Sequence, residues 1–277
     1  MNTYSNKSIK LFFSITIFLS AIAEVVICTT GQQMMYLILM WIPAFSALAA
    51  NCLRLRDASE SITTRKLLAW GNIHKCKIQY ILLGCLLPLV YLLIPYAVYW
   101  NIHPETFAYN GVSLHIILSD CLPITVIGIF SSLLSALGEE IGWRGFMVPA
   151  LYEKVGLNKA LALSSLFWCC WHLPILMFGN YMSGTPAWYK LPAFILCIFP
   201  VGVMAGLLAI QSESLWPAAF LHAAHNNYDQ AVFGIITIGG ADRMYFVSET
   251  GILTILCTWI LAIALYFWTK KQLQARV

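Results

Sequence analysis

Hydrophobic residues follow one another in long runs along this chain, and short polar segments separate the runs. Eight runs are long enough to cross a membrane as helices, because a helix rises 1.5 Å per residue and the hydrocarbon core is roughly 30 Å thick. Only helices and closed barrels satisfy their backbone in lipid, and the apolar positions do not alternate as barrel strands require. The expected spans are residues 11–28, 34–52, 78–100, 113–138, 158–178, 191–210, 214–237 and 251–268.

The composition supports a membrane protein. Of the 277 residues, 60% are hydrophobic and 10% are charged, whereas a soluble domain carries about 25% charged residues. This balance excludes a soluble globular domain, a disordered chain and a secreted module held by disulfides. The sequence predicts an all-α polytopic bundle of about eight transmembrane helices. We expect residues 1–277 to form a single transmembrane domain, with a motif-bearing core at 113–237.

Positive charges fall almost entirely on one side of the predicted spans. Cytoplasmic loops are enriched in Lys and Arg, so the basic side, which holds both termini, is expected to be cytoplasmic. Only Lys190 and Arg243 fall on the other side, and the net charge of +4 is spread over loops, which predicts no nucleic-acid partner. The basic side holds Lys7, Lys10, Arg54, Arg56, Arg65, Lys66, Lys75, Lys77, Arg144, Lys154, Lys159, Lys270, Lys271 and Arg276.

The first span has one alternative interpretation. Lys7, Lys10, an apolar run and Ala21-Ile22-Ala23 resemble a cleavable signal peptide that would end near residue 23. The apolar run continues to Cys28, so we expect an uncleaved first helix. The chain is short and shows no further domain, and we expect an integral protein of the bacterial cytoplasmic membrane.

The first polar cluster is Gly138-Glu139-Glu140-Ile141-Gly142-Trp143-Arg144, at the end of the fourth span. On a helix, Glu140 and Arg144 share a face, and Arg144 is expected to neutralise Glu140 with a fork of hydrogen bonds. Glu139 points about 100° away and is free to act as a general base. The alternative is an ion pair at the helix end that reaches toward the interface.

Two histidine clusters lie in later spans. His172 is late in the fifth span, where the alternative role is a hydrogen bond to a neighbouring helix. His222 and Asn226 share one face of the seventh span, with His225 nearby and Asn227 next in sequence. The alternative to a catalytic role for this cluster is hydrogen bonding between helices. For His225, a hydrogen bond to a neighbouring helix is favoured over a place in the wall of the site.

Together the clusters bring a carboxylate, two imidazoles and an amide to the bilayer interior from three helices. These groups can activate water and stabilise an oxyanion. The set Glu139, His172 and His222 would also be acceptable zinc ligands with an open position. The cofactor expectation is therefore none or zinc, with a slight preference for none.

At these residues the chain resembles the CAAX protease and bacteriocin-processing family of intramembrane peptidases, also called the Abi family. The family shares Glu-Glu-x-x-x-Arg, Phe-x-x-x-His and His-x-x-x-Asn motifs on successive helices. The first is complete in Glu139, Glu140 and Arg144, and the third in His222 and Asn226. The second departs from the pattern, because Trp168 stands four residues before His172. An aromatic residue is kept, and we interpret the change as tolerated.

The resemblance implies an endopeptidase that cleaves a membrane-associated protein or peptide, reached from the cytoplasmic side. Glu139 and His172 would activate water, and His222 and Asn226 would stabilise the oxyanion. Glu140 and Arg144 would orient Glu139 from behind.

Two other classes of function stay open at this stage. One is a non-proteolytic immunity or partner-binding protein of the same family. The other is a proton-coupled transporter, which the absence of an inverted repeat disfavours. The substrate is equally open: a prenylated C-terminal tail, a bacteriocin leader and a signalling membrane protein all fit.

Overall fold

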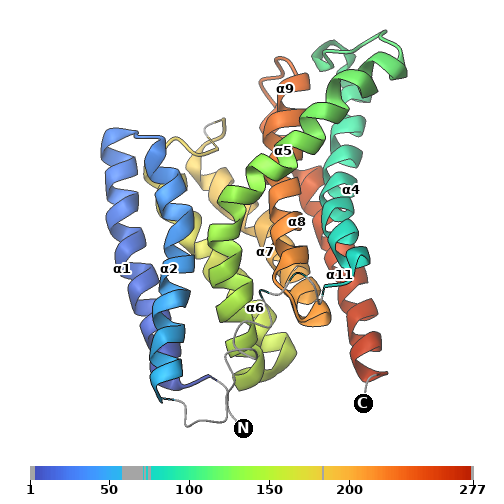
Figure 1. Cartoon of the computed structure of the whole chain (residues 1–277). Coiled ribbons are helices and arrows are strands. Elements are labelled where there is room, and N and C mark those ends of the chain that lie inside the picture. The colour runs from blue at the N-terminus through green and yellow to red at the C-terminus, as the bar shows by residue number, and fades with distance from the viewer. Residues whose placement is uncertain (1–3, 58–70, 72, 74–75, 183, 276–277) are drawn as a thin grey trace.

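In the computed structural model the chain is a bundle of helices (Figure 1). Residues 4–275 are described, except 58–70, 72, 74–75 and 183. Four of the predicted basic-side residues, Arg65, Lys66, Lys75 and Arg276, lie outside the described residues. The long helices are α1 Asn6–Thr30, α2 Met34–Asp57, α4 Ile78–Ile102, α5 Leu114–Gly142, α6 Val148–Phe178, α7 Ala187–Ser212, α8 Trp216–Asn226 and α11 Ile252–Gln274.

Short helical turns complete the described part of the chain, and its one β-bridge, between Phe107 and Thr237, is isolated. The all-α prediction is thereby confirmed. The turns are η3 Pro104–Thr106, η4 Trp143–Met147, η5 Asn227–Phe233, α9 Gly234–Ile236, α10 Arg243–Phe246 and η6 Ser248–Thr250.

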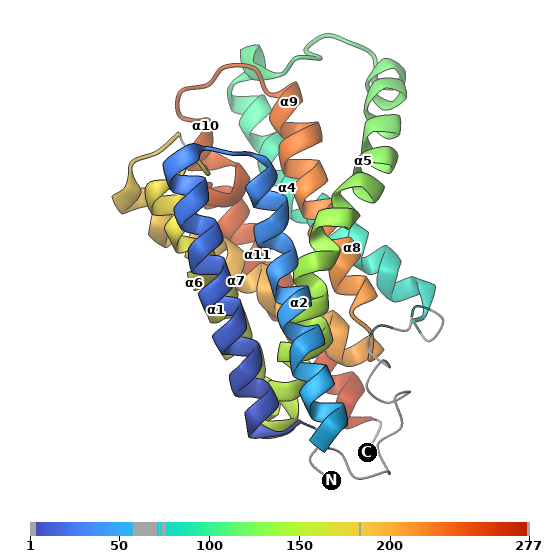
Figure 2. The same cartoon turned by 60° about the vertical axis from the view of Figure 1, so that its left-hand side comes forward.

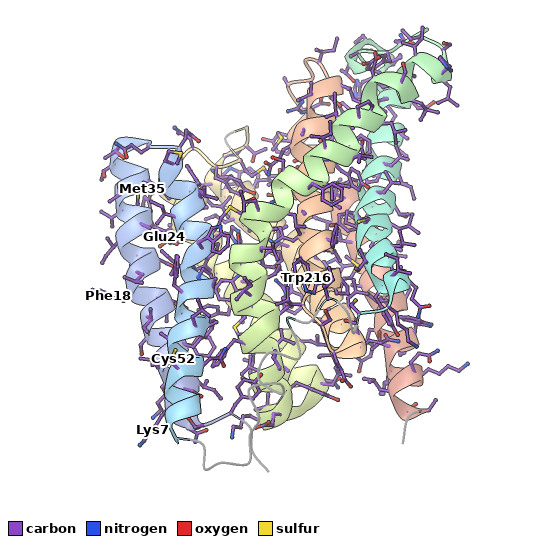
Figure 3. All side chains as sticks on the ribbon, viewed as in Figure 1. Lys7, Phe18, Glu24, Met35, Cys52 and Trp216 are labelled. Atoms are coloured by element: carbon purple, nitrogen blue, oxygen red, sulfur yellow. The ribbon has the colours of Figure 1, made fainter. Side chains whose placement is uncertain are left out.

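Helix α1 shows how the apolar runs become a bundle. Residues three or four apart form a buried stripe on one face, from Phe12 through Thr16 and Ser20 to Ala23. The opposite face stays apolar and exposed, as at Phe18, which points away from the bundle in Figure 3 and is 65% exposed. Such a surface is stable only against lipid.

Eight chain segments were expected to span the membrane, and each of them is helical. Six described helices are long and apolar enough by length and composition. One of these, Leu114–Phe178, contains two of the expected spans, which meet where Gly156 breaks the helix with φ +76°. The segment 214–237 is not among the six, because π-helical turns interrupt it after α8. The chain is an integral, multi-pass helical bundle, and the count of eight stays a prediction.

Both ends of the chain lie at the same end of the bundle (Figure 1), as an even number of passes requires. Figure 2 shows the first half of α5 standing apart from its neighbours, and the side chains there, such as Leu114 and Ile127, are largely exposed. The second half of α5 packs against α2 and α8.

Glycines allow the close contact between α5 and α2. A Cβ atom on Gly138 would lie 2.6 Å from the carbonyl oxygen of Met40, and one on Gly142 would overlap Pro43. Small residues of this kind let helix backbones approach closely. The contact fixes the turn that carries Glu139 and Glu140 against a neighbouring helix.

Candidate active site

A cavity of about 400 Å³ lies between the helices. Its wall includes all four residues expected to be catalytic: Glu139, His172, His222 and Asn226. They come from three helices, α5, α6 and α8. Glu140 and Arg144 are not part of the wall and lie behind it, both almost completely buried.

Glu139 is held by two tryptophans. Its Oε2 atom accepts a hydrogen bond of 2.7 Å from Nε1 of Trp168 and one of 3.1 Å from Nε1 of Trp143. Its other oxygen, Oε1, has no hydrogen bond to any described residue. Because Glu139 lines the cavity, Oε1 is the oxygen available to a water molecule.

The pairing of Glu140 with Arg144 is present, but it is not the expected fork. Nη1 of Arg144 donates to Oε1 of Glu140 at 2.7 Å, and Nδ1 of His222 lies 3.0 Å from the same oxygen. Oε2 of Glu140 and Nε of Arg144 have no partner among the described residues. One carboxylate oxygen is therefore shared by a cation and an imidazole.

A π-helical turn contributes to this geometry. Residues Trp143–Met147 adopt π-helix, an arrangement that often marks functional sites. Arg144 in this turn reaches the backbone oxygen of Gly202 on α7, and its guanidinium lies 4.6 Å from the centre of the Trp168 ring. Arg144 thereby connects α5, α6 and α7 directly behind the cavity.

His172 and His222, the two histidines expected to be catalytic, each have one ring nitrogen committed to the protein. Nδ1 of His172 donates to the backbone oxygen of Trp168 at 2.8 Å, because a carbonyl can only accept. Nδ1 of His222 similarly donates to the Glu140 carboxylate. The Nε2 atoms of both rings have no hydrogen bond to the described residues, which leaves them for a ligand in the cavity.

His225 also lines the cavity, but both of its nitrogens are occupied. Nε2 donates to Oε1 of Glu249 at 2.9 Å, and Nδ1 lies 2.9 Å from the hydroxyl of Tyr91. The favoured interpretation of His225, a bond to a neighbouring element, agrees with this geometry. Asn227 donates to the backbone oxygen of Thr125 on α5 and does not line the cavity.

Two cavity residues, Glu249 and Tyr181, were not expected from the sequence. The hydroxyl of Tyr181 donates to Oε2 of Glu249 at 2.8 Å. Burial, together with the Glu249 carboxylate, raises the pKa of Tyr181 well above its ordinary value, so the phenol stays protonated and keeps donating. Both residues lie in connections between helices, where no motif or periodicity marks them.

The donor set does not form a ready zinc site. Among the described residues, no three His, Cys, Asp or Glu side chains converge into a group that could hold a metal ion. We therefore derive no step that depends on a metal.

The cavity lies toward the end of the bundle opposite to the termini. Its wall includes Gln33 between α1 and α2, Asn180 between α6 and α7, and Glu249 before α11. The connection between α1 and α2 lies at the end of these helices opposite to the chain termini (Figure 1), and Figure 3 shows Met35, close to Gln33, at the end opposite to Lys7. If the cavity opens at this end, cytoplasmic termini and cytoplasmic access, both expected from the sequence, exclude each other.

Known proteins are similar to the part of the chain that carries the three motifs. Residues 122–228 match the family described as type II CAAX prenyl endopeptidase Rce1-like. The CAAX prenyl protease 2 of Methanococcus maripaludis is 27% identical over 158 residues, which cover 56% of this chain and 52% of that protein. The chain thus spans about half the length of the curated relative it matches. The matched segment contains every residue of the three motifs, and there the chain is similar to the CAAX protease family that those motifs resemble.

Proposed function

We propose that this protein is an intramembrane endopeptidase that hydrolyses a peptide bond of a membrane-associated protein or peptide. One observation carries the proposal. Glu139, His172, His222 and Asn226 come from three helices to the wall of one cavity. Oε1 of the carboxylate and Nε2 of both imidazoles are uncommitted there, which is the arrangement that water activation needs.

In the proposed reaction, Glu139 and His172 bind the attacking water. The water oxygen attacks the carbonyl carbon of the substrate while its proton passes to Oε1 of Glu139. As the carbon–nitrogen bond breaks, Glu139 returns this proton to the leaving amine. Such proton transfers by a positioned side chain contribute about 10²- to 10⁴-fold to rate.

His222 and Asn226 would stabilise the oxyanion of the tetrahedral intermediate. Asn226 can donate from its amide. His222 must carry a proton on Nε2 to donate, in addition to the one that Nδ1 shares with Glu140. The Glu140 carboxylate would offset the positive charge of that doubly protonated ring, while Arg144 offsets the charge of Glu140.

The substrate class follows from the location of the cavity. A cavity between transmembrane helices, beside lipid, favours a peptide that is itself held at the membrane. A prenylated peptide with a C-terminal CAAX sequence is the first probe to try, because the relative from Methanococcus maripaludis is a CAAX prenyl protease. We propose the bacterial cytoplasmic membrane as the location.

The proposal is tested by comparing peptide termini in cells that express the wild type or Glu139→Gln. The purified proteins are compared in parallel on a farnesylated, internally quenched CAAX peptide. Glu24→Gln is the matched control, because Glu24 is also a buried glutamate but lies on α1 away from the cavity. We expect new termini and peptide cleavage with the wild type and the control, and neither with Glu139→Gln. Cleavage by Glu139→Gln would contradict the proposal.

A further inference from the structure

Trp168 stands where the second motif has phenylalanine, and the two side chains differ in one chemical property that matters here. Both are large aromatic rings, but only the indole carries an N–H donor. In this chain that donor is used. Nε1 of Trp168 lies 2.7 Å from Oε2 of Glu139, and both residues are almost completely buried.

This hydrogen bond connects two helices. Trp168 is on α6 and Glu139 is at the end of α5, 29 positions away in sequence. Trp143, the second donor to the same oxygen, is on the turn that follows Glu139 and bonds at 3.1 Å. The Trp168 contact is the shorter of the two, and it is the one that fixes Glu139 relative to the helix that carries His172.

The remaining contacts of Trp168 do not need the indole nitrogen. Its backbone oxygen accepts from Nδ1 of His172. Its ring lies under the guanidinium of Arg144 and meets the ring of His222 edge-on, with centroids 5.3 Å apart. A phenylalanine would keep the backbone contact and an aromatic face, so the N–H is the specific contribution of tryptophan at this position.

We infer that Trp168 is a positioning residue for Glu139. Its N–H holds Oε2 and thereby turns Oε1 toward the cavity, where Nε2 of His172 is also uncommitted. A hydrogen bond to a carboxylate is stronger than one between neutral groups, and a carboxylate held by two indole donors has few orientations left. The inference rests on the proposed function, because it assigns Trp168 a part in the same site.

A purely structural role gives a different expectation. Buried tryptophans usually find an acceptor for their N–H, and if that were all, loss of the N–H would lower stability and leave the chemical step unchanged. Trp100 provides the matched case, because its Nε1 donates to Thr237 at 3.0 Å away from the cavity.

The test replaces the indole N–H by sulfur, using 3-benzothienylalanine at position 168 of the full-length protein in lipid nanodiscs. The same replacement at position 100 is the control. Trp168→Phe is a second variant that restores the aromatic residue of the motif. The first measurement is the infrared carboxylate stretching band of Glu139, identified as the band that Glu139→Gln removes. The second is kcat and KM on the farnesylated CAAX peptide.

We expect both position-168 variants to shift the Glu139 band. On the peptide, kcat should fall about 10- to 100-fold, as loss of one hydrogen bond to a charged group predicts, with KM changed by less than about twofold. The position-100 variant should shift neither the band nor kcat. An unmoved Glu139 band in both position-168 variants overturns the inference, and so does a shifted band with kcat unchanged, because a purely structural role predicts an unchanged chemical step. Cleavage by Glu139→Gln would instead count against the proposed function.

Discussion

His222 and His225 lie three residues apart on α8 and both line the cavity, yet their surroundings differ. His222 gives one nitrogen to Glu140 and leaves the other uncommitted. His225 has both nitrogens occupied, by Glu249 and Tyr91. The comparison shows that burial of a histidine in a membrane bundle does not by itself indicate chemistry. The uncommitted nitrogen distinguishes a group that can meet a substrate from one that holds the wall together.

The largest expected effect separates these two histidines by activity. His222→Ala removes the proposed oxyanion donor, and we expect peptide cleavage to fall by about 10²-fold or more. His225→Ala should reduce cleavage less than tenfold and instead lower the thermal unfolding midpoint, because it leaves buried groups on Glu249 and Tyr91 without a partner, at about 1–3 kcal/mol each. Cleavage rates and unfolding curves of the two purified variants check this. Equal losses of activity in His222→Ala and His225→Ala would contradict the different roles assigned to the two histidines.

A second prediction concerns the support behind His222. Glu140→Gln leaves Arg144 buried without a counter-charge, and breaking a buried ion pair in this way costs about 3–5 kcal/mol. We expect lower thermal stability together with lower activity. Glu213→Gln, at an exposed glutamate, is the control. A Glu140→Gln protein that is fully stable yet inactive would indicate that Glu140, and not Glu139, is the base.

The sequence predicted the residues around His222 better than those around His225. Glu139, His172, His222 and Asn226 were expected because ionisable and amide groups are costly inside apolar runs, and the structure gathers them around one cavity. Glu249 follows no apolar run and shares no motif, so only the folded chain shows that it faces His225. The shared oxygen of Glu140 was missed for a related reason, since spacing along one helix cannot reveal a third partner from another.

The helices themselves were largely predictable from length and hydrophobicity. The π-helical turn at Trp143–Met147 was not, because it depends on how the end of α5 packs against its neighbours. The location of the cavity was equally hidden. Charge patterning orients the chain, but it cannot indicate at which end the helices leave an opening.

A third prediction resolves that orientation. If the basic end is cytoplasmic, a membrane-impermeant maleimide added to intact cells should label Asn180→Cys, beside the cavity, and leave Lys7→Cys unlabelled above the wild-type background. Both positions are exposed in the structure, so access across the membrane is the only variable. The opposite labelling pattern would reverse the orientation and place the cavity on the cytoplasmic side.

The smallest expected effect concerns metal. Without a metal-dependent step, stringent chelation should leave cleavage within about twofold of its starting value, and zinc added back should not increase it. Metal content is measured on the same sample. Loss of activity on chelation that zinc restores would favour the alternative in which Glu139, His172 and His222 rearrange into a zinc site.

The central claim is that Glu139 activates the hydrolytic water, and cleavage of the farnesylated CAAX peptide by Glu139→Gln tests it most directly. The glutamine keeps the size of the side chain and loses the proton-accepting oxygen. We predict no detectable cleavage from a protein that inserts and unfolds like the wild type, beside full cleavage by Glu24→Gln. Cleavage by Glu139→Gln at a rate near that of Glu24→Gln would contradict the account.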